Sequence, residues 1–430
     1  MRARSLAPWW SFAAAVLAVT AHAETTAVVA AKAYTLTSPG AIENATIVIR
    51  DGRIVSVVAG GVPPAGARVV DAQGRIVTPG LMSAGTQLGL IEVDSTAADA
   101  TVSSGALGAA FDVQYALDPN STSLALARAD GLTRAVTFPS QSADAPFNGI
   151  GAVLRLEEGP KILDVPRAGM FATTGGMSAA SAGGSRGAQW LLLRNALDEA
   201  KRCAAAPAQC RNAGQGEQLV NRLNREALGA VVQGTMPLAI TAARESDIRQ
   251  AIRLAGDYGI RVFVYGGAEA WRAAADLAAR RIPVVLDPFA NTPATFDEIG
   301  ARADNAAILH RAGVTIAFAV PGISMTHNAG SIVREAAGLA VANGLPWDEA
   351  LRALTVNPAR IWGVDQRYGS LAPGKEADLV IWDGDPLEPS SAPVVVLVAG
   401  REVPLTSRQT ELRDRYSPRR ATDPLPPPFR

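Results

Sequence analysis

The sequence predicts an α/β protein that contains a parallel sheet and a small β-sandwich assembled from both ends of the chain. Residues 27–77 alternate apolar and polar side chains, the two-residue period of half-buried strands. Between residues 134 and 343, short apolar strands alternate with helical stretches, as in repeated βα units around a parallel sheet. Strand-like runs return within residues 378–403. Both ends of the chain are therefore expected to contribute strands to the sandwich.

The sandwich is expected to be antiparallel, because Asx-Gly and Gln-Gly pairs separate its apolar runs as hairpin turns. Its predicted strands are 28–36, 45–58, 67–77, 378–382 and 394–403, with turns at Asp51-Gly52, Gln73-Gly74 and Ala399-Gly400.

The central region is expected to supply the parallel strands and the helices that cover them. The candidate strands are 134–138, 238–241, 261–265, 283–286 and 314–319. The candidate helices are 246–258 with Ser246 as N-cap, 268–280, and 329–343 ended by Gly344. Residues 173–187 are rich in Gly, Ser and Ala and are expected to form a mobile loop, either a lid or a solvated connector.

Composition sets the size of the core and limits the partners. A chain of 430 residues with 48% hydrophobic content can bury one large domain and a small second one. Its 40 basic and 40 acidic side chains cancel, so no long-range field attracts nucleic acid or an anionic membrane surface. We therefore expect neither of these partners.

The first residues have the order of a secretory signal. Arg2 and Arg4 precede an apolar run over 6–19, and Ala21-His22-Ala23 follows as a small-x-small cleavage site. We expect cleavage after Ala23 and a periplasmic location. The alternative is an uncleaved membrane anchor, which needs about 20 apolar residues. No later segment is long and apolar enough to span a bilayer.

The chain has two cysteines, Cys203 and Cys210, in what we expect to be a polar, Ala-rich loop. In an oxidising compartment they can form a small disulfide, which we favour over metal binding by two thiolates alone. Removal of the signal also removes His22, so His310 and His327 are the only histidines of the mature chain.

Two motifs at opposite ends of the chain resemble a known family. They are VVDAQGRIVTPGL, residues 69–81, and LTVNPARIWGVDQRYGSLAPGKEADLVIWDGDPLE, residues 354–388. Together they resemble the amidohydrolase superfamily, most closely its imidazolonepropionase-like branch. The resemblance implies a (β/α)8 barrel of the TIM type beside a composite β-sandwich. The segments it implies are a signal peptide at 1–23, sandwich at 24–80, barrel at 81–366, sandwich at 367–405 and an Arg/Pro-rich tail at 406–430.

The resemblance also implies that this chain lacks the family's metal ligands. In that family the strand ending VTPGL leads into a His-x-His pair that binds a catalytic metal, but Gly85 and Gln87 stand in those places. The family's later histidine ligands fall at Thr241 and Tyr265, and its aspartate falls near Pro321. Zinc and iron sites prefer imidazole and carboxylate ligands. We therefore predict no metal cofactor, the ancestral zinc or iron site having been lost.

The reacting groups of such barrels lie at the carboxyl ends of the strands, where other polar side chains remain. Asp287 can serve as a general base or simply close an Asp-Pro turn. His327 can titrate beside the pocket or cap a helix together with Asn328. We predict Asp287 and His327 as catalytic residues. The predicted substrate-binding residues are Gln87, Arg244 and Tyr265, and Glu245 and Glu269 also lie at strand ends.

Two functions remain open at this point. The resemblance implies an exported hydrolase of carbon-nitrogen bonds other than peptide bonds. The missing ligands favour an inactive scaffold that binds a small molecule or pairs with an active paralogue, and whether the chain is an enzyme stays undecided. In both cases we expect a small-molecule ligand, no nucleic acid, no membrane after signal cleavage, and either a homo-oligomer or a paired subunit.

Overall fold

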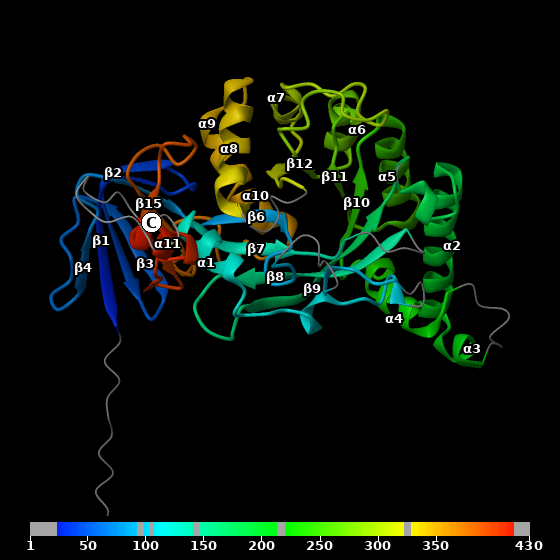
Figure 1. Ribbon diagram of the computed structural model, residues 1–430, viewed down its shortest axis with the longest axis horizontal. Helices are drawn as coiled ribbons and strands as arrows, with labels where there is room; N and C mark the ends of the chain where they lie inside the picture. The colour runs from blue at the N-terminus through cyan, green and yellow to red at the C-terminus, as the bar shows by residue number, and fades with distance from the viewer. Residues whose placement is uncertain are drawn as a thin grey trace, which may run out of the picture.

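Two sheets of eight strands each dominate the fold of the computed structural model. It describes residues 24–92, 99–103, 107–140, 146–176, 178–212, 220–321 and 328–416. One sheet combines strands from both ends of the chain, and the other curves into a nearly closed barrel. The two lie side by side along the longest axis of the molecule (Figure 1). The predicted signal peptide at 1–23 lies outside the described residues.

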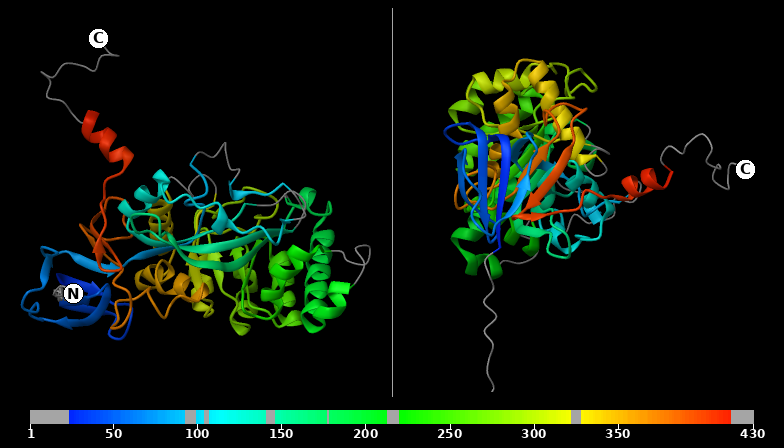
Figure 2. Two further views of the ribbon diagram at one scale, coloured as in Figure 1. Left: turned by 90° about the horizontal axis from the view of Figure 1, so that it is seen from below. Right: turned by 90° about the vertical axis from the view of Figure 1, so that its left-hand side faces the viewer.

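The first sheet has the composite origin that the sequence predicts. Its strand order is β16-β15-β14-β5-β1-β2-β3, with β4 paired to β1. Antiparallel pairing of β5 with β14 joins the two ends of the chain, and Figure 2 shows the blue and orange strands together. The bounds are β1 Thr25–Tyr34, β2 Ala41–Arg50, β3 Arg53–Ala59, β4 Arg68–Asp71, β5 Ile76–Pro79, β14 Leu379–Trp382, β15 Pro393–Val398 and β16 Arg401–Glu402.

The barrel strands follow one another around the second sheet in chain order, from β6 to β13. The bounds are β6 Leu81–Thr86, β7 Leu132–Thr137, β8 Phe147–Arg155, β9 Leu163–Thr173, β10 Leu238–Ala242, β11 Val262–Gly266, β12 Val284–Leu286 and β13 Ile316–Phe318. The two end strands, β6 and β13, also come close together, so the barrel is nearly closed. The predicted barrel beside a composite sheet is confirmed, but the expectation of a purely antiparallel sheet is wrong, because β1 pairs in parallel with both β4 and β5. Gln73-Gly74 is therefore not a hairpin turn, since the strands before and after it both pair with β1 and not with each other.

One strand departs from an all-parallel arrangement. β8 runs antiparallel to both β7 and β9. Its connections, 138–146 and 156–162, are too short for the helical crossover that parallel neighbours need, whereas antiparallel neighbours need only a short loop. The sequence motifs at the two ends of the chain carry no information about this reversal.

Helices cover the outside of the barrel, with α8 and α9 nearer the composite sheet and α2 and α5 toward the far end (Figure 1). Their bounds are α1 Thr122–Ala129, α2 Arg186–Ala205, α3 Pro207–Asn212, α4 Arg222–Val232, α5 Glu245–Tyr258, α6 Ala274–Ala279, α7 Asn305–Arg311, α8 Ala329–Ala342, α9 Trp347–Ala353, α10 Val356–Ile361 and α11 Arg408–Tyr416. In the described part of the chain, no helix combines the length and apolar character needed to cross a bilayer.

Two helix predictions need correction. The helix expected from Ser246 begins one residue earlier, and its N-cap is Arg244, which makes no side-chain capping bond. The buried carboxylate of Glu269 accepts a hydrogen bond from the backbone N–H of Glu245 instead, at 2.9 Å. The helix expected over 268–280 is broken into a 3-10 turn, Ala270–Ala273, and α6. A cap supplied by a distant residue leaves no local pattern in the sequence.

Several contacts connect the Gly-rich stretch 173–187 to its neighbours, and its mobility stays a prediction. Within its described residues, Ser185 caps α2 by accepting a hydrogen bond from the backbone N–H of Ala188 at 3.2 Å. The N–H of Gly176 donates to Oδ2 of Asp297 at 2.7 Å, and Arg186 pairs with both Asp297 and Asp247. These contacts fasten the stretch to the segment after β12 and to α5.

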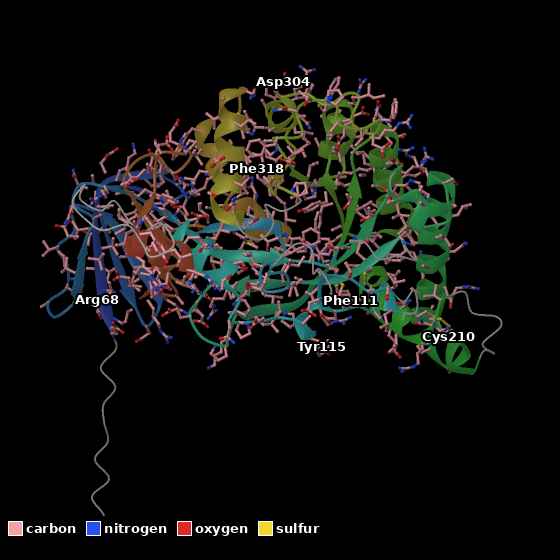
Figure 3. The ribbon with its side chains drawn as sticks, in the orientation of Figure 1. Arg68, Phe111, Tyr115, Cys210, Asp304 and Phe318 are labelled. Carbon is pink, nitrogen blue, oxygen red and sulfur yellow. A yellow bond between two sulfur atoms is a disulfide. The ribbon has the colours of Figure 1, made fainter. Side chains whose placement is uncertain are left out.

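Cys203 and Cys210 form a disulfide, with Cα atoms 5.4 Å apart. Cys203 lies in α2 and Cys210 in α3, so the bond joins two helices where the sequence suggests a loop. Figure 3 places Cys210 at the opposite end of the molecule from Arg68 of the composite sheet. A free thiol is absent from the described residues.

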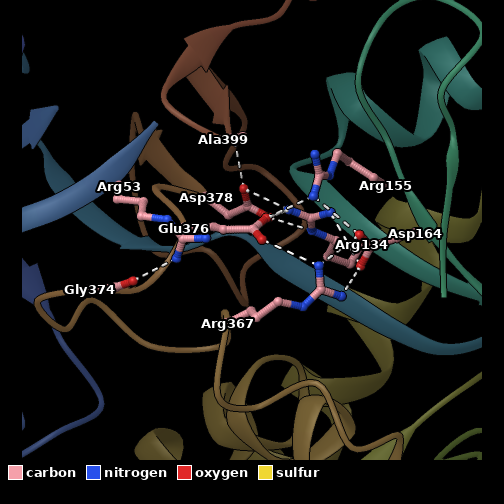
Figure 4. Close-up of polar contacts among 9 residues, drawn as sticks. All are labelled: Arg53, Arg134, Arg155, Asp164, Arg367, Gly374, Glu376, Asp378 and Ala399. Atoms are coloured by element: carbon pink, nitrogen blue, oxygen red, sulfur yellow. Dashed lines mark hydrogen bonds and ion pairs between the residues drawn. The ribbon is translucent and has the colours of Figure 1, made fainter. Parts of the chain in front are cut away.

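A buried ion-pair cluster connects the barrel to the composite sheet (Figure 4). Arg134 of β7 has a side chain only 1% exposed, and it pairs with Glu376 at 2.6 Å and Asp378 at 2.7 Å. Asp164 of β9 also forms ion pairs with Arg155 and Arg367. Burial alone would raise the pKa of Asp164, but the hydrogen bond from Arg367 and the neighbouring guanidinium charges hold that pKa below its ordinary value.

Candidate functional site

Aromatic side chains fill the barrel from one end to the other. Phe171 stacks on Phe138 with ring centroids 4.5 Å apart and on Trp362 at 5.5 Å. Phe263 meets Trp362 edge to face at 4.9 Å, and Tyr265 meets Phe138 in the same way at 5.2 Å. The column runs from Trp362, beside the amino ends of the strands, to Tyr265 at the carboxyl end of β11. The interior is therefore a packed core up to the rim where reacting groups are expected.

Tyr265 fills the space beside Gly85. A Cβ atom added at Gly85 would lie 2.3 Å from the Tyr265 hydroxyl oxygen and 2.9 Å from its ring, closer than any ordinary contact. The position at which the resemblance predicts the family's first histidine is thus closed by a side chain from β11. Gly85 is the residue that fits against this tyrosine, and any larger residue needs Tyr265 to move.

The Tyr265 hydroxyl is buried without a hydrogen-bond partner in the described part of the chain. The side chain is 5% exposed. Burial, and secondarily the negative charge of Asp287, raise the pKa of Tyr265 far above its ordinary value. The group is therefore a neutral phenol at physiological pH, with an O–H available as a donor.

Asp287 follows β12 at the same rim. Val285 belongs to the barrel interior and Leu286 to the outer core, so strand alternation directs Asp287 inward again. Its Oδ1 accepts a hydrogen bond from the backbone N–H of Phe289 at 2.9 Å, which is the Asp-Pro turn considered above. The carboxylate is half-buried, and burial raises the pKa of Asp287 above its ordinary value. Hydrogen bonds from the backbone N–H groups of Phe289 and Ala290 oppose this effect of burial, so the turn itself engages the carboxylate.

Two amides lie at the same end of the barrel. Gln87 is 8% exposed, and its Nε2 donates to Oγ of Ser140 at 2.5 Å. Asn148 lies at the start of β8, and its only sequence signal is its place in the glycine-rich stretch FNGIG, which does not predict a site residue. Asn148 donates from Nδ2 to Thr173 at 2.8 Å, but its Oδ1 has no partner among the described residues. An unpaired acceptor therefore accompanies the unpaired tyrosine hydroxyl.

The other predicted residues lie as follows. Arg244 is exposed at the start of α5, whereas Glu269 is buried and accepts hydrogen bonds from the N–H groups of Glu245 and Gly300. Glu245 pairs with Arg249 on the helix surface. Glu269 and Glu245 thus have structural partners. His327 lies outside the described residues.

The described residues do not fit the metal centre that the family implies. Within those ranges, no group of three or more His, Cys, Asp and Glu side chains is placed to hold a metal ion. Thr241, one of the inherited ligand positions, instead uses its backbone oxygen to accept hydrogen bonds from Thr174. Tyr265, another, is a buried neutral phenol. A catalytic zinc site needs about three protein ligands of the imidazole, thiolate or carboxylate type.

Comparison with known proteins agrees with this fold. The model of the amidohydrolase family matches residues 268–406. An amidohydrolase from Thermotoga maritima MSB8 has a structure similar to 89% of this chain and 100% of its own, with a TM-score of 0.78 and 23% identity. Residues 268–406 therefore match the amidohydrolase family, and the chain has an amidohydrolase fold.

Two further members of the comparison are more distant. Amidohydrolase tasK of Hapsidospora irregularis is 44% identical over 73 residues, which cover 17% of this chain and only 7% of that protein. A molinate hydrolase structure covers 94% of this chain and 99% of its own at 17% identity, with a TM-score of 0.54. The amidohydrolase fold is thus shared along nearly the whole chain, and the likeness to a hydrolase remains a resemblance.

Proposed function

We propose that this amidohydrolase-superfamily protein binds a small polar molecule at the carboxyl-terminal rim of its barrel without the family's metal ion. The observation that carries the proposal is the close fit of Tyr265 against Gly85. It fills the place of the first histidine with an aromatic side chain. We also propose that the chain lacks the family's metal ligands and that it belongs to the imidazolonepropionase-like branch.

The ligand we propose is a neutral molecule with an amide-like group. Tyr265 offers an O–H donor and Asn148 offers a carbonyl acceptor, both buried and unpaired among the described residues. An amide carries a C=O for the first and an N–H for the second. A buried polar group left unpaired costs about 1–3 kcal/mol, so a molecule that pairs both groups gains that free energy on binding.

The experiment is metal analysis of the full mature chain after equilibrium with Zn²⁺ and with Fe²⁺. We expect far less than one tightly held ion per chain, and no loss of folding stability in chelator. A stoichiometric ion that stabilises the protein would contradict the proposal. The matched control is a Gln87→His variant, because one imidazole falls short of the ligand set that a tight site needs.

A second function, hydrolysis of a non-peptide C–N bond, is favoured by the Asp287 carboxyl group. Its raised pKa brings it closer to the range of a general base. In this scheme the carboxylate takes a proton from water as the water oxygen bonds to the amide carbon. Tyr265 donates a hydrogen bond to the developing oxyanion, and the proton then passes to the leaving nitrogen as the C–N bond breaks. Hydrolysis of simple amides in chelator, abolished by Asp287→Asn, would favour this function over binding alone.

We also propose export to the periplasm and cleavage after Ala23. The disulfide between Cys203 and Cys210 supports this, because such bonds persist in oxidising compartments. N-terminal sequencing of the protein from a periplasmic extract tests it, and a mature chain that begins at Glu24 is expected. The proposed partners are the small molecule and either a second copy or an active paralogue, with neither nucleic acid nor, after cleavage, a membrane.

A further inference from the structure

A hollow of about 700 Å³ lies at the other end of the barrel, where β10 to β13 begin. Its apolar side chains include Pro237, Ile260, Phe263, Ile282 and Val314. The volume falls within the range of about 300–1,000 Å³ in which proteins bind small molecules. The proposed rim site at the carboxyl ends of the strands takes no part in it.

Four arginines border this hollow: Arg261, Arg280, Arg281 and Arg360. None of the residues that line it is acidic. Within the described residues none of the four guanidinium groups forms an ion pair, and Arg261 donates only to the backbone oxygen of Thr235. In a chain whose formal charge is zero, four uncompensated cations around one hollow produce a local positive field.

Helix ends account for part of this arrangement. Arg280 follows α6 directly and Arg360 lies in the last turn of α10, where a cation is favoured by the helix dipole. That preference explains Arg280 and Arg360 separately. It does not explain why all four arginines border one hollow.

The backbone at Arg281 gives a second, independent observation. Arg281 has φ of 54°, in the left-handed region, at the position that ends α6. Glycine is the usual residue there because a side chain costs free energy in this conformation. Arg281 adopts this conformation although it is not glycine, and it borders the hollow.

Gly256 of α5 makes room for a neighbouring guanidinium. A Cβ atom at Gly256 would lie 2.6 Å from Nη1 of Arg280, so the bare backbone lets this group lie against the helix at the border of the hollow. Together the arginines offer several N–H donors in planar pairs, the geometry that matches carboxylate and phosphate oxygens.

We propose that this hollow binds a small amphiphilic anion, a carboxylate or phosphate group carried on an apolar body. The arginines hold the anionic group, and the apolar side chains cover the body. The site is independent of the proposed function at the opposite rim.

The test is calorimetric titration of the full mature chain with octanoate and with octyl phosphate, beside octanol and inorganic phosphate. We expect one saturable site for at least one octyl anion, bound at least tenfold more tightly than either octanol or phosphate. The two octyl anions distinguish a carboxylate from a phosphate ligand. The proposal would be overturned if neither octyl anion bound saturably. It would also be overturned if inorganic phosphate bound as tightly as the octyl anions.

Arg281→Gly separates binding from folding. Glycine suits the left-handed backbone, so the variant should be as stable as the parent or more so, yet bind the octyl anion at least fivefold more weakly. Arg360→Gln should weaken binding similarly. Arg222→Gln, on the exposed face of α4 and away from the hollow, is the matched control and should bind as the parent does.

Two further results would count against a small-molecule site. One is unchanged affinity in both Arg281→Gly and Arg360→Gln. The other is binding to vesicles of anionic phospholipid that these variants abolish, with no binding of either soluble octyl anion, because that would assign the arginines to a membrane contact.

Discussion

Nε of Arg134 lies 2.7 Å from Oδ2 of Asp378, across the boundary between the barrel and the composite sheet. Arg134 comes from barrel strand β7, and Asp378 directly precedes β14 of the other sheet. The same guanidinium reaches Glu376 and Asp164, so one buried cation holds three carboxylates from distant parts of the chain. The ion pair is therefore a joint between the two sheets.

Removal of this cation should destabilise the protein severely. Arg134→Met leaves the buried carboxylate of Asp378 without its counter-charge, and breaking a buried pair in this way costs about 3–5 kcal/mol. Urea unfolding measures the loss. The matched control is Arg222→Met, because its pair with Glu226 is exposed on both sides and should contribute less than about 1 kcal/mol. Equal effects of the two substitutions would show that Arg134 is not the joint.

Stability should fall at both ends of the pH range. The lowered pKa of Asp164 contributes stability that is present above the unfolded value, about 3.9, and is lost as pH falls through the folded pKa. The raised pKa of Tyr265 acts at the other end, because the unfolded tyrosine ionises from about pH 10 while the folded one resists. Free energies of unfolding from pH 2 to 11 should show both declines. Asp164→Asn should flatten the acid decline, and Tyr265→Phe the alkaline one.

Gly85→Ala should destabilise the barrel through its contact with Tyr265. The added methyl would meet the hydroxyl at 2.3 Å, and overpacking of this kind costs about 1–3 kcal/mol. Gly229→Ala is the control, because nothing lies within 4 Å of its position in α4 and alanine should stabilise that helix by about 0.5–1 kcal/mol. In a Tyr265→Ala background the penalty at 85 should disappear. A penalty that persists there would mean that another neighbour opposes the side chain.

Asp287→Asn should separate stability from function. Asparagine can keep the turn contact with the Phe289 N–H, and it removes a charge whose burial raises the pKa of the carboxyl. The variant should be more stable than the parent at pH 7, and this gain should vanish at acid pH where the parent's carboxyl is protonated. Its affinity for an amide probe such as acetamide should fall about tenfold, or 1.4 kcal/mol. Unchanged affinity would restrict Asp287 to closing its turn.

The sequence predicts those parts of the fold that local patterns encode. The turns at Asp51-Gly52 and Ala399-Gly400 and the strands at both ends follow from alternation and turn chemistry, and the structure contains all of them. The reversal of β8 and the capping of α5 by Glu269 depend on contacts between distant residues. Such contacts leave no periodic signal along the chain.

In the candidate site, too, local features can be predicted from the sequence, whereas contacts between distant residues cannot. A glycine at 85 is visible in the sequence, but the tyrosine that packs against it is not, because 180 positions separate the two residues. Asn148 was missed for a similar reason. Its unpaired oxygen is a property of its buried surroundings, and the adjacent glycines say nothing about them.

The pairing of β5 with β14 also sets an order on folding. Ile76 lies opposite Trp382, so β5, near the start of the chain, can pair fully only after β14, near its end, has been made. Until then β5 presents an open edge, which is where unfinished chains aggregate. Contacts this far apart in sequence form slowly because a long loop must close first. A chain truncated before residue 379 would therefore leave this edge of its first sheet unpaired and should aggregate more readily than the full chain.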